Sequence, residues 1–135
     1  MTKKSIWVID DDAIYQILAN KIIQRSELFS NVNSFVNGKL AIDALHTIIR
    51  KTTDTNENIP DIILLDINMP IMDGWEFMEE MSLIKSQVNK KIIVYIVSSS
   101  IAAEDKKKSK TYSDIVGYLS KPISMNDLEL IALNE

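Results

Sequence analysis

Three aspartates and a lysine stand where they could together bind a divalent cation and accept a phosphoryl group. Asp10 and Asp11 directly follow one apolar run, Asp66 follows another, and Lys121 comes soon after a third. Carboxylates gathered in one place repel one another, and a divalent cation with a nearby ammonium group relieves that repulsion. Oxygen ligands without His or Cys suit a hard ion such as Mg²⁺. One oxygen of Asp66 would then be free to attack phosphorus, while the metal and Lys121 neutralise the phosphoryl charge.

The elements that must position these side chains alternate along the sequence between apolar runs and stretches of helical period. The β-branched apolar runs predict strands over residues 5–9, 33–36, 61–65, 91–97 and 115–119. The helical stretches predict helices over residues 13–24, 39–50, 74–85, 103–110 and 126–133. The third and fourth strands are almost continuously apolar, which is typical of central strands covered on both faces. The alternation predicts a parallel α/β sheet wrapped by helices.

Two predicted helices carry apolar residues at a spacing that places them on one face. These residues are Ile14, Ile17, Leu18 and Ile22 in the first helix, and Leu40, Ala44, Leu45 and Ile48 in the second. Both stripes should face the sheet. Asp12 and Asp73 stand where helix N-caps are expected, so Asp12 is interpreted as a cap and not as a metal ligand. The polar segment 51–58 predicts a surface loop before the third strand.

The predicted sheet locates the candidate site. In an open parallel sheet, ligands bind at the carboxyl ends of the strands. The first and third predicted strands end at the aspartates, the fourth ends at three serines (residues 98–100), and the fifth ends shortly before Lys121. Taken singly, such residues are more often caps or turn formers. Their conjunction at the ends of separate strands is what indicates a functional site.

Composition and charge exclude several classes of protein. The chain has 135 residues, of which 46% are hydrophobic and 25% charged, as expected for one globular domain. It lacks cysteine, a signal peptide and a run long enough to span a membrane, so we expect a cytoplasmic protein. A net charge of −4 argues against direct nucleic-acid binding. With three glycines, the chain cannot form the phosphate-cradling loop of a nucleotide-binding enzyme.

Four segments in order match a known family. They are the acid pair after the first strand, the stretch DINMPIMDG (residues 66–74), a hydroxyl after the fourth strand, and GYLSKP (residues 117–122). With these segments, the chain resembles the receiver domain of bacterial two-component response regulators over essentially its whole length. The resemblance implies a flavodoxin-like (βα)5 three-layer sandwich whose parallel five-stranded sheet has the order 2-1-3-4-5. It also implies that residues 1–135 form a single receiver domain without an output domain.

The resemblance assigns roles to residues of the acidic site. It implies that Asp66 is the phospho-acceptor, and that Asp11, Asp66 and the backbone carbonyl of Asn68 bind Mg²⁺ directly. Asp10 would hold the metal through water. Lys121 would contact the phosphoryl group, and its bond to the following proline would be cis.

The resemblance further implies a switch of two residues. Tyr118 would rotate inward when a hydroxyl after the fourth strand moves to bind the phosphate, although a half-exposed strand aromatic is the simpler interpretation of Tyr118. Counting back from the acidic pair Glu104 and Asp105 selects Ser98 as that hydroxyl. The family's usual spacing to the lysine selects Ser99.

A signalling domain is the function that the resemblance implies, rather than an enzyme, although the domain would catalyse its own phosphorylation and dephosphorylation. A sensor histidine kinase or a phosphotransfer protein would donate the phosphoryl group. A downstream protein would then bind the surface of the fourth helix, fifth strand and fifth helix. The chain would be a monomer or a phosphorylation-dependent dimer, and either a stand-alone regulator or a receiver excised from a larger protein.

Other classes fit the sequence less well. A Mg²⁺-dependent phosphohydrolase with an Asp nucleophile would place a second acid two residues after Asp66, where this chain has Asn68. A pseudo-receiver, which binds partners without being phosphorylated, is disfavoured because no acid of the site is missing. The lysines at residues 106–108 and 110 are interpreted as a solvated helix face, with an acidic partner as the alternative.

Overall fold

The computed structural model describes residues 3–51, 58–88, 90–99 and 102–133. Five parallel strands form one sheet with the order β2-β1-β3-β4-β5. The strands are β1 (Lys4–Ile9), β2 (Phe29–Phe35), β3 (Ile62–Leu65), β4 (Ile93–Ser98) and β5 (Ile115–Ser120). The helices are α1 (Ala13–Ser26), α2 (Gly38–Arg50), α3 (Gly74–Ile84), α4 (Ala103–Ser109) and α5 (Met125–Leu133), with a 3-10 turn at Lys85–Gln87. The predicted flavodoxin-like fold and strand order are confirmed.

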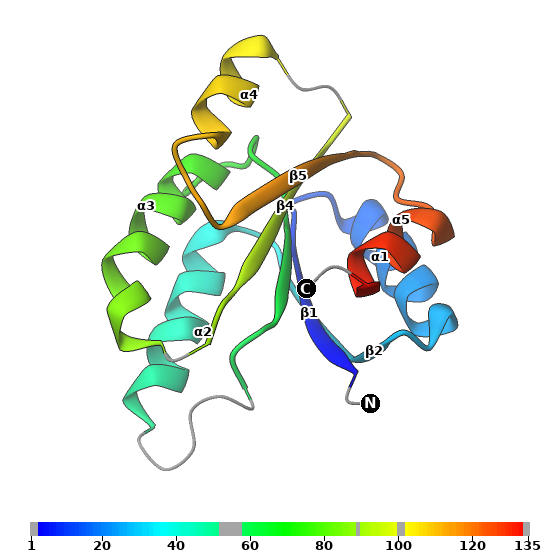
Figure 1. Cartoon of the computed structure of the whole chain (residues 1–135), viewed down its shortest axis with the longest axis horizontal. Helices are drawn as coiled ribbons and strands as arrows, with labels where there is room; N and C mark the ends of the chain where they lie inside the picture. Colours follow the sequence, from blue (N-terminus) through cyan, green and yellow to red (C-terminus); the bar gives the residue numbers. More distant parts are fainter. Residues whose placement is uncertain (1–2, 52–57, 89, 100–101, 134–135) are drawn as a thin grey trace.

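Helices cover the two faces of the sheet, as Figure 1 shows, with α1 and α5 on one face and α2 and α3 on the other. Each face has its own buried cluster of apolar side chains. On the α2 and α3 face the cluster is built around Phe77 and Leu45, and on the other face around Ile6 and Leu128. β3 and β4 both lie inside the sheet, as their apolar sequences predict. The predicted loop at residues 51–58 lies largely outside the described residues.

The prediction for the buried face of α1 is wrong. The side chains of Ile14, Ile17 and Leu18 are 72%, 59% and 56% exposed. Ile22 is half-buried, and the residues that face inward are Tyr15, Gln16, Ala19 and Ile23. The cause is the amide of Gln16, which hydrogen-bonds backbone carbonyls at the ends of β1 and β2. With Gln16 pointing into the protein, the face that it shares with Tyr15, Ala19 and Ile23 is buried, and Ile14, Ile17 and Leu18 are turned outward.

The stripe predicted for α2 is wrong at one end. Leu40 is 48% exposed, whereas Leu45 is buried as predicted. Ala44 and Ile48 are half-buried and pack against the core. Ala41, one residue after Leu40, is fully buried instead. Its small side chain carries little hydrophobic signal in the sequence, although it occupies the face that packs on the sheet.

The edge strand β2 begins four residues earlier than predicted, at Phe29 instead of residue 33. Most of its residues are polar or exposed, which is why hydrophobicity gave no signal there. The other strand and helix boundaries differ from the prediction by one or two residues, except that the 3-10 turn after α3 extends the helical conformation. No helix in the described part of the chain is long and apolar enough to cross a membrane.

The short helix α4 is joined to α3 by an aromatic contact. The indole Nε1 of Trp75, in the first turn of α3, donates a hydrogen bond of 3.2 Å to Asp105 Oδ1 of α4. The same indole stacks on Tyr112, with 6.1 Å between ring centroids, and Lys108 Nζ lies 5.3 Å from its ring centre. The hydroxyl of Tyr112 donates to Glu79 of α3 at 2.8 Å. The contacts of Asp105 and Lys108 thus join α4 to α3, and those of Tyr112 join the loop after α4 to α3.

Candidate functional site

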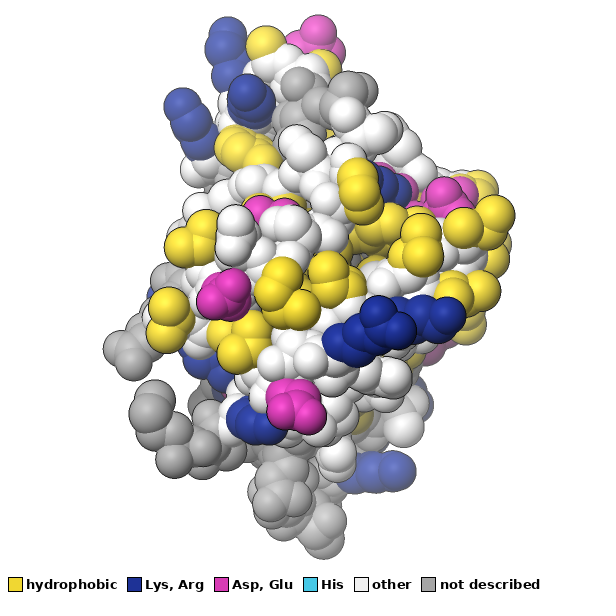
Figure 2. All heavy atoms as spheres, turned by 90° about the vertical axis from the view of Figure 1, so that its right-hand side faces the viewer, with side chains coloured by type: hydrophobic (Ala, Val, Ile, Leu, Met, Phe, Trp, Pro, Cys, Tyr) yellow, Lys and Arg dark blue, Asp and Glu magenta, His cyan; other side chains and the backbone are white. Residues whose placement is uncertain are grey.

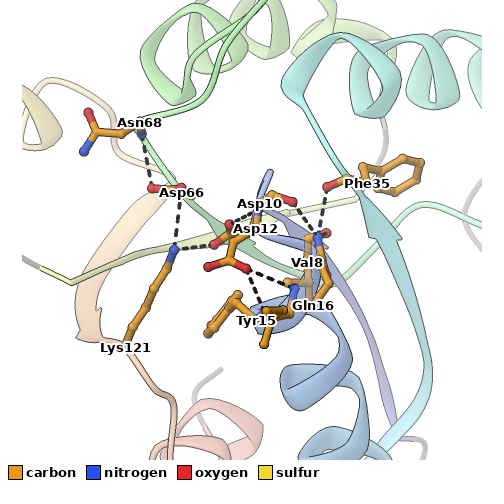
Figure 3. A network of polar contacts seen from close by, with 10 residues as sticks. Val8, Asp10, Asp12, Tyr15, Gln16, Phe35, Asp66, Asn68 and Lys121 are labelled. Atoms are coloured by element: carbon orange, nitrogen blue, oxygen red, sulfur yellow. Dashed lines mark hydrogen bonds and ion pairs between the residues drawn. The ribbon is translucent and has the colours of Figure 1, made fainter.

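The carboxyl ends of β1, β3 and β5 bring Asp10, Asp66 and Lys121 together, as Figure 3 shows. Lys121 Nζ lies 2.6 Å from Asp10 Oδ2 and 3.6 Å from Asp66 Oδ2. Both aspartates are buried, and the lysine side chain is 19% exposed. The ammonium group therefore lies against two carboxylates in a partly desolvated site. Buried charges require this kind of pairing.

Backbone amides fix the orientation of both buried carboxylates. The amide of Asp12 donates to Asp10 Oδ1 at 2.9 Å, and the amide of Asn68 donates to Asp66 Oδ1 at 3.1 Å. In each case a residue two positions along the chain holds one oxygen, as in an Asx-turn. The other oxygen of each carboxylate faces Lys121. The site thus presents two carboxylate oxygens whose directions are set by the main chain.

The loop after Asp66 packs closely against the start of α3 at Gly74. A Cβ atom at this position would lie 2.7 Å from Ile67 Cα and 2.8 Å from the carbonyl oxygen of Asp66. Both neighbours are backbone atoms, so the loop would have to shift to admit any other residue. Asp73 caps α3 through a hydrogen bond to the amide of Glu76, as predicted. Gly74 and this cap fix the path of the chain beside the candidate phospho-acceptor.

Gln16 is a residue of the site region that the sequence did not reveal. Its side-chain Nε2 lies 3.2 Å from the carbonyl oxygen of Val8, 3.0 Å from that of Asp10 and 3.0 Å from that of Phe35. The amide group therefore ties the end of β1 to the end of β2 directly beneath the acidic pair. No signal in the sequence marks it, because the apolar residues of α1 predict a different face of the helix to be buried.

Asp10, Asp11 and Asp66 form an oxygen-ligand set that fits a divalent cation. One carboxylate oxygen of each lies within 4.8 Å of those of the other two. Asp11 is exposed, so the set opens to solvent on one side. Oxygen donors without His or Cys, with room for water, suit Mg²⁺. Asp12, by contrast, accepts hydrogen bonds from the amides of Ile14 and Tyr15, which confirms it as the N-cap of α1.

The electrostatics of the site affect the acid and the base in different ways. Burial raises the pKa of Asp66, the Asn68 amide lowers it, and the neighbouring charge of Asp10 raises it further. Burial alone would lower the pKa of Lys121, but its hydrogen bond and attraction to Asp10 outweigh this, and the pKa is raised. Lys121 is therefore a permanent cation at neutral pH. For Asp66, the charge of Lys121 lowers the pKa, but burial and the neighbouring acids outweigh this effect, and the pKa is raised.

The two serine candidates differ in position. Ser98 is the last residue of β4 and is buried, and its carbonyl oxygen accepts a hydrogen bond of 3.0 Å from the amide of Lys121. Ser99 is exposed, and Ser100 lies outside the described residues. This contact joins the backbone of Ser98 to that of Lys121, and the choice of the Ser98 hydroxyl over that of Ser99 stays a prediction. The peptide bond between Lys121 and the following proline is cis, as the resemblance implies.

Tyr118 points away from the acidic residues toward α4. Its hydroxyl donates a hydrogen bond of 3.0 Å to the carbonyl oxygen of Lys106, and it also contacts the hydroxyl of Ser109. Glu104 and Asp105 lie in the first turn of α4, as predicted. In this structure, Tyr118 therefore joins β5 to α4.

A family model described as the response regulator receiver domain matches residues 6–132. Because this match covers most of the chain, the chain belongs to the response regulator receiver domain family of two-component systems. Members of this family are signalling domains.

The chain is similar to proteins of known structure and to other characterised proteins. It is 31% identical to the two-component response regulator of Cytophaga hutchinsonii, with a TM-score of 0.79 over 100% of both chains. It is 27% identical to the chemotaxis protein CheY of Halobacterium salinarum, over 88% of this chain and 85% of that protein. It is also 30% identical to a protein-glutamate methylesterase/protein-glutamine glutaminase of Treponema denticola, over 96% of this chain but 32% of that protein. The chain thus spans about a third of the methylesterase's length.

Proposed function

We propose that this domain is a phosphorylation-controlled switch in which Asp66 accepts a phosphoryl group in the presence of Mg²⁺. The observation that carries the proposal is the position of Lys121, whose ammonium group lies against the free oxygens of two buried, backbone-held carboxylates. A phosphoryl group arriving at Asp66 would meet this cation directly. Asn68, two residues after Asp66, offers no acid to protonate a leaving group, which disfavours a phosphohydrolase.

Each residue of the site has a separate role in the proposed phosphoryl transfer. Asp66 Oδ2 forms the new bond to phosphorus, while the bond from phosphorus to the donor's leaving atom breaks and its electron pair departs with that atom. Lys121 neutralises charge on the phosphoryl oxygens, which is the main requirement of such transfers. Asp10, Asp11, Asp66 and the Asn68 carbonyl would hold Mg²⁺, with Asp10 acting through water. When bound, the ion supplies further neutralisation of the phosphoryl charge.

Phosphorylation would then change the surface of the domain. A phosphoryl group adds a charge of about −1.5 to −2, which attracts Lys121 and the hydroxyl of Ser98. We propose that Tyr118 gives up its hydrogen bond to Lys106 when Ser98 moves, and that α4 is then released from β5. The surface of α4, β5 and α5 would thereby report the state of Asp66 to a downstream protein. The exposed lysines of α4 (residues 106–108) would suit a downstream protein with an acidic surface.

The proposed phosphodonor is a sensor histidine kinase or a phosphotransfer protein. Figure 2 shows hydrophobic side chains gathered on the face that α1 and α5 cover. Ile14, Ile17 and Leu18, called here the α1 surface, are exposed and lie in the first turns of α1, the helix that follows the acidic pair in the chain. An exposed apolar surface of this kind is typical of protein contact sites. The proposal includes a cytoplasmic location, a single receiver domain over residues 1–135, and a monomer or phosphorylation-dependent dimer.

The test is to incubate the domain with Mg²⁺ and acetyl phosphate and to measure its intact mass. We expect a phosphoryl-sized increase that disappears in Asp66→Asn. Asp12→Asn is the matched control, because Asn can also cap a helix and the label should persist. The proposal fails if the wild-type protein gains no mass or if Asp66→Asn is still labelled. In the first case, the pseudo-receiver interpretation would take its place.

A further inference from the structure

Lys121 contacts a third group besides the two carboxylates. Its Nζ lies 4.6 Å from the centre of the Tyr15 ring, within the range of a cation–π interaction. Tyr15 is 7% exposed and packs in the apolar cluster between the sheet and the helices α1 and α5. Because the ring is enclosed, it cannot turn away from the lysine without disturbing that cluster. Figure 3 shows Tyr15 and Lys121 on the same side of the acidic pair.

The hydroxyl of Tyr15 takes no part in the contact with Lys121, which involves the face of the ring. Within the described part of the chain, this buried oxygen has no hydrogen-bond partner. Burial raises the pKa of Tyr15, and the charges of Asp10, Asp66 and Asp127 raise it further, so the phenol stays neutral. The aromatic ring is thus the part of Tyr15 that the site uses.

We propose that Tyr15 is a positioning residue whose ring face holds the ammonium group of Lys121 beside Asp66. This inference rests on the function proposed above. An acidic residue at position 15 would bind Lys121 and compete with the phosphoryl group. An aliphatic residue would leave Lys121 held by the carboxylates of Asp10 and Asp66 alone, without a ring face against its ammonium group. A ring attracts the cation without a net charge of its own, so it keeps Lys121 available for the phosphoryl oxygens.

The first test uses the metal-free protein and does not depend on phosphorylation. The ε-CH₂ protons of Lys121 should show an upfield ring-current shift in the NMR spectrum of the wild-type protein. The shift should persist in Tyr15→Phe and disappear in Tyr15→Leu. A wild-type spectrum without the shift, or a shift that survives Tyr15→Leu, would overturn the proposal.

The second test measures the rate of labelling by acetyl phosphate. Tyr15→Leu should slow labelling about fivefold, the size expected for losing a partly desolvated cation–π contact, and Tyr15→Phe should rescue it. Ile23→Ala is the packing control: it creates a cavity in the same cluster without touching Lys121, so it should lower stability but not the rate. In a Lys121→Met background, Tyr15→Leu should cause no further slowing.

The outcomes separate this inference from the proposed function. Equal slowing by Tyr15→Leu with and without Lys121, or slowing in Tyr15→Phe as large as in Tyr15→Leu, would refute the positioning role. If the wild-type protein is not labelled, the proposed function fails, and the resonance shift alone decides whether the ring of Tyr15 lies against Lys121 in solution. If Lys121→Met abolishes labelling, no rate can be compared in that background, and the resonance shift is the deciding measurement.

Discussion

Asp10 and Asp66 are held in the same way, although they belong to different strands. Each gives one oxygen to a backbone amide two residues further on and directs the other toward Lys121. A single cation thus serves two anions, and Asp11 adds a third acid nearby. Without a metal, the site holds more negative than positive charge. This imbalance has consequences for stability that can be measured.

The raised pKa of Asp66 predicts a pH-dependent cost to folding. A carboxyl whose pKa is higher in the folded state binds its proton more tightly there. Its contribution to stability is therefore complete below the unfolded value of 3.8 and is lost as pH rises through the folded value. At neutral pH the charged group opposes folding. Asp66→Asn should raise the free energy of unfolding of the metal-free protein by about 1 kcal/mol near neutral pH.

Urea unfolding at several pH values, without Mg²⁺, measures this effect. The gain from Asp66→Asn should shrink as the pH falls toward the unfolded pKa, because Asp66 is then protonated in both states. Asp12→Asn, which preserves the helix cap, should show no such gain. A gain that grows with falling pH would contradict the prediction.

Mg²⁺ should stabilise the folded domain, since the unfolded chain does not gather the three acids. At a concentration 100 times its Kd, a ligand of the folded state adds about 2.7 kcal/mol. Asp11→Asn should lose most of this stabilisation. Because Asp11 is exposed, the substitution should leave the metal-free stability nearly unchanged. Thermal unfolding with and without Mg²⁺ measures both values, and an undiminished effect of Mg²⁺ in Asp11→Asn would exclude Asp11 as a ligand.

At the scale of elements, the orientation of α1 depends on the hydrogen bonds of Gln16 and not on the burial of its isoleucines at positions 14 and 17. Replacing Gln16 with Leu would remove the side-chain donor that three backbone carbonyls at the ends of β1 and β2 share. We expect Gln16→Leu to lower the free energy of unfolding by about 2 kcal/mol. Ile17→Ala, at an exposed position, should cost much less despite the loss of apolar atoms. Chemical denaturation of the two variants tests this, and the reverse order would show that the helix is oriented by its isoleucines.

This comparison also shows how far the sequence could predict the structure. The parallel sheet and the approach of Asp10, Asp66 and Lys121 follow from apolar runs and from the geometry of parallel sheets, whereas the strand order is implied by the resemblance to receiver domains. The inward face of α1 depends on partners of Gln16 that lie up to 19 residues away in the chain, and no local pattern encodes them. The contact between Tyr15 and Lys121 joins even more distant positions. Interactions of this kind emerge only when the elements have packed.

On the scale of the whole molecule, the α1 surface should bind the protein that donates the phosphoryl group. Ile17→Glu should slow transfer from a phosphorylated histidine-containing donor domain about tenfold, because it places a charge in an apolar contact. Labelling by acetyl phosphate should be unaffected, since a small donor needs no such surface. Leu83→Glu is the matched control: Leu83 is 72% exposed on α3, which covers the other face of the sheet. If both substitutions slow transfer equally, the α1 surface is not the docking site.

The contact between Trp75 and α4 has a practical consequence for following the molecule in solution. Of the two tryptophans, Trp7 is buried in the core, whereas Trp75 is half-buried beside Asp105, Lys108 and Tyr112. Indole emission is sensitive to adjacent charges and to exposure to water. A displacement of α4 would change the charges next to Trp75 and its exposure to water, whereas the surroundings of Trp7 would stay the same. The fluorescence of Trp75 should therefore report a movement of α4 without an attached dye.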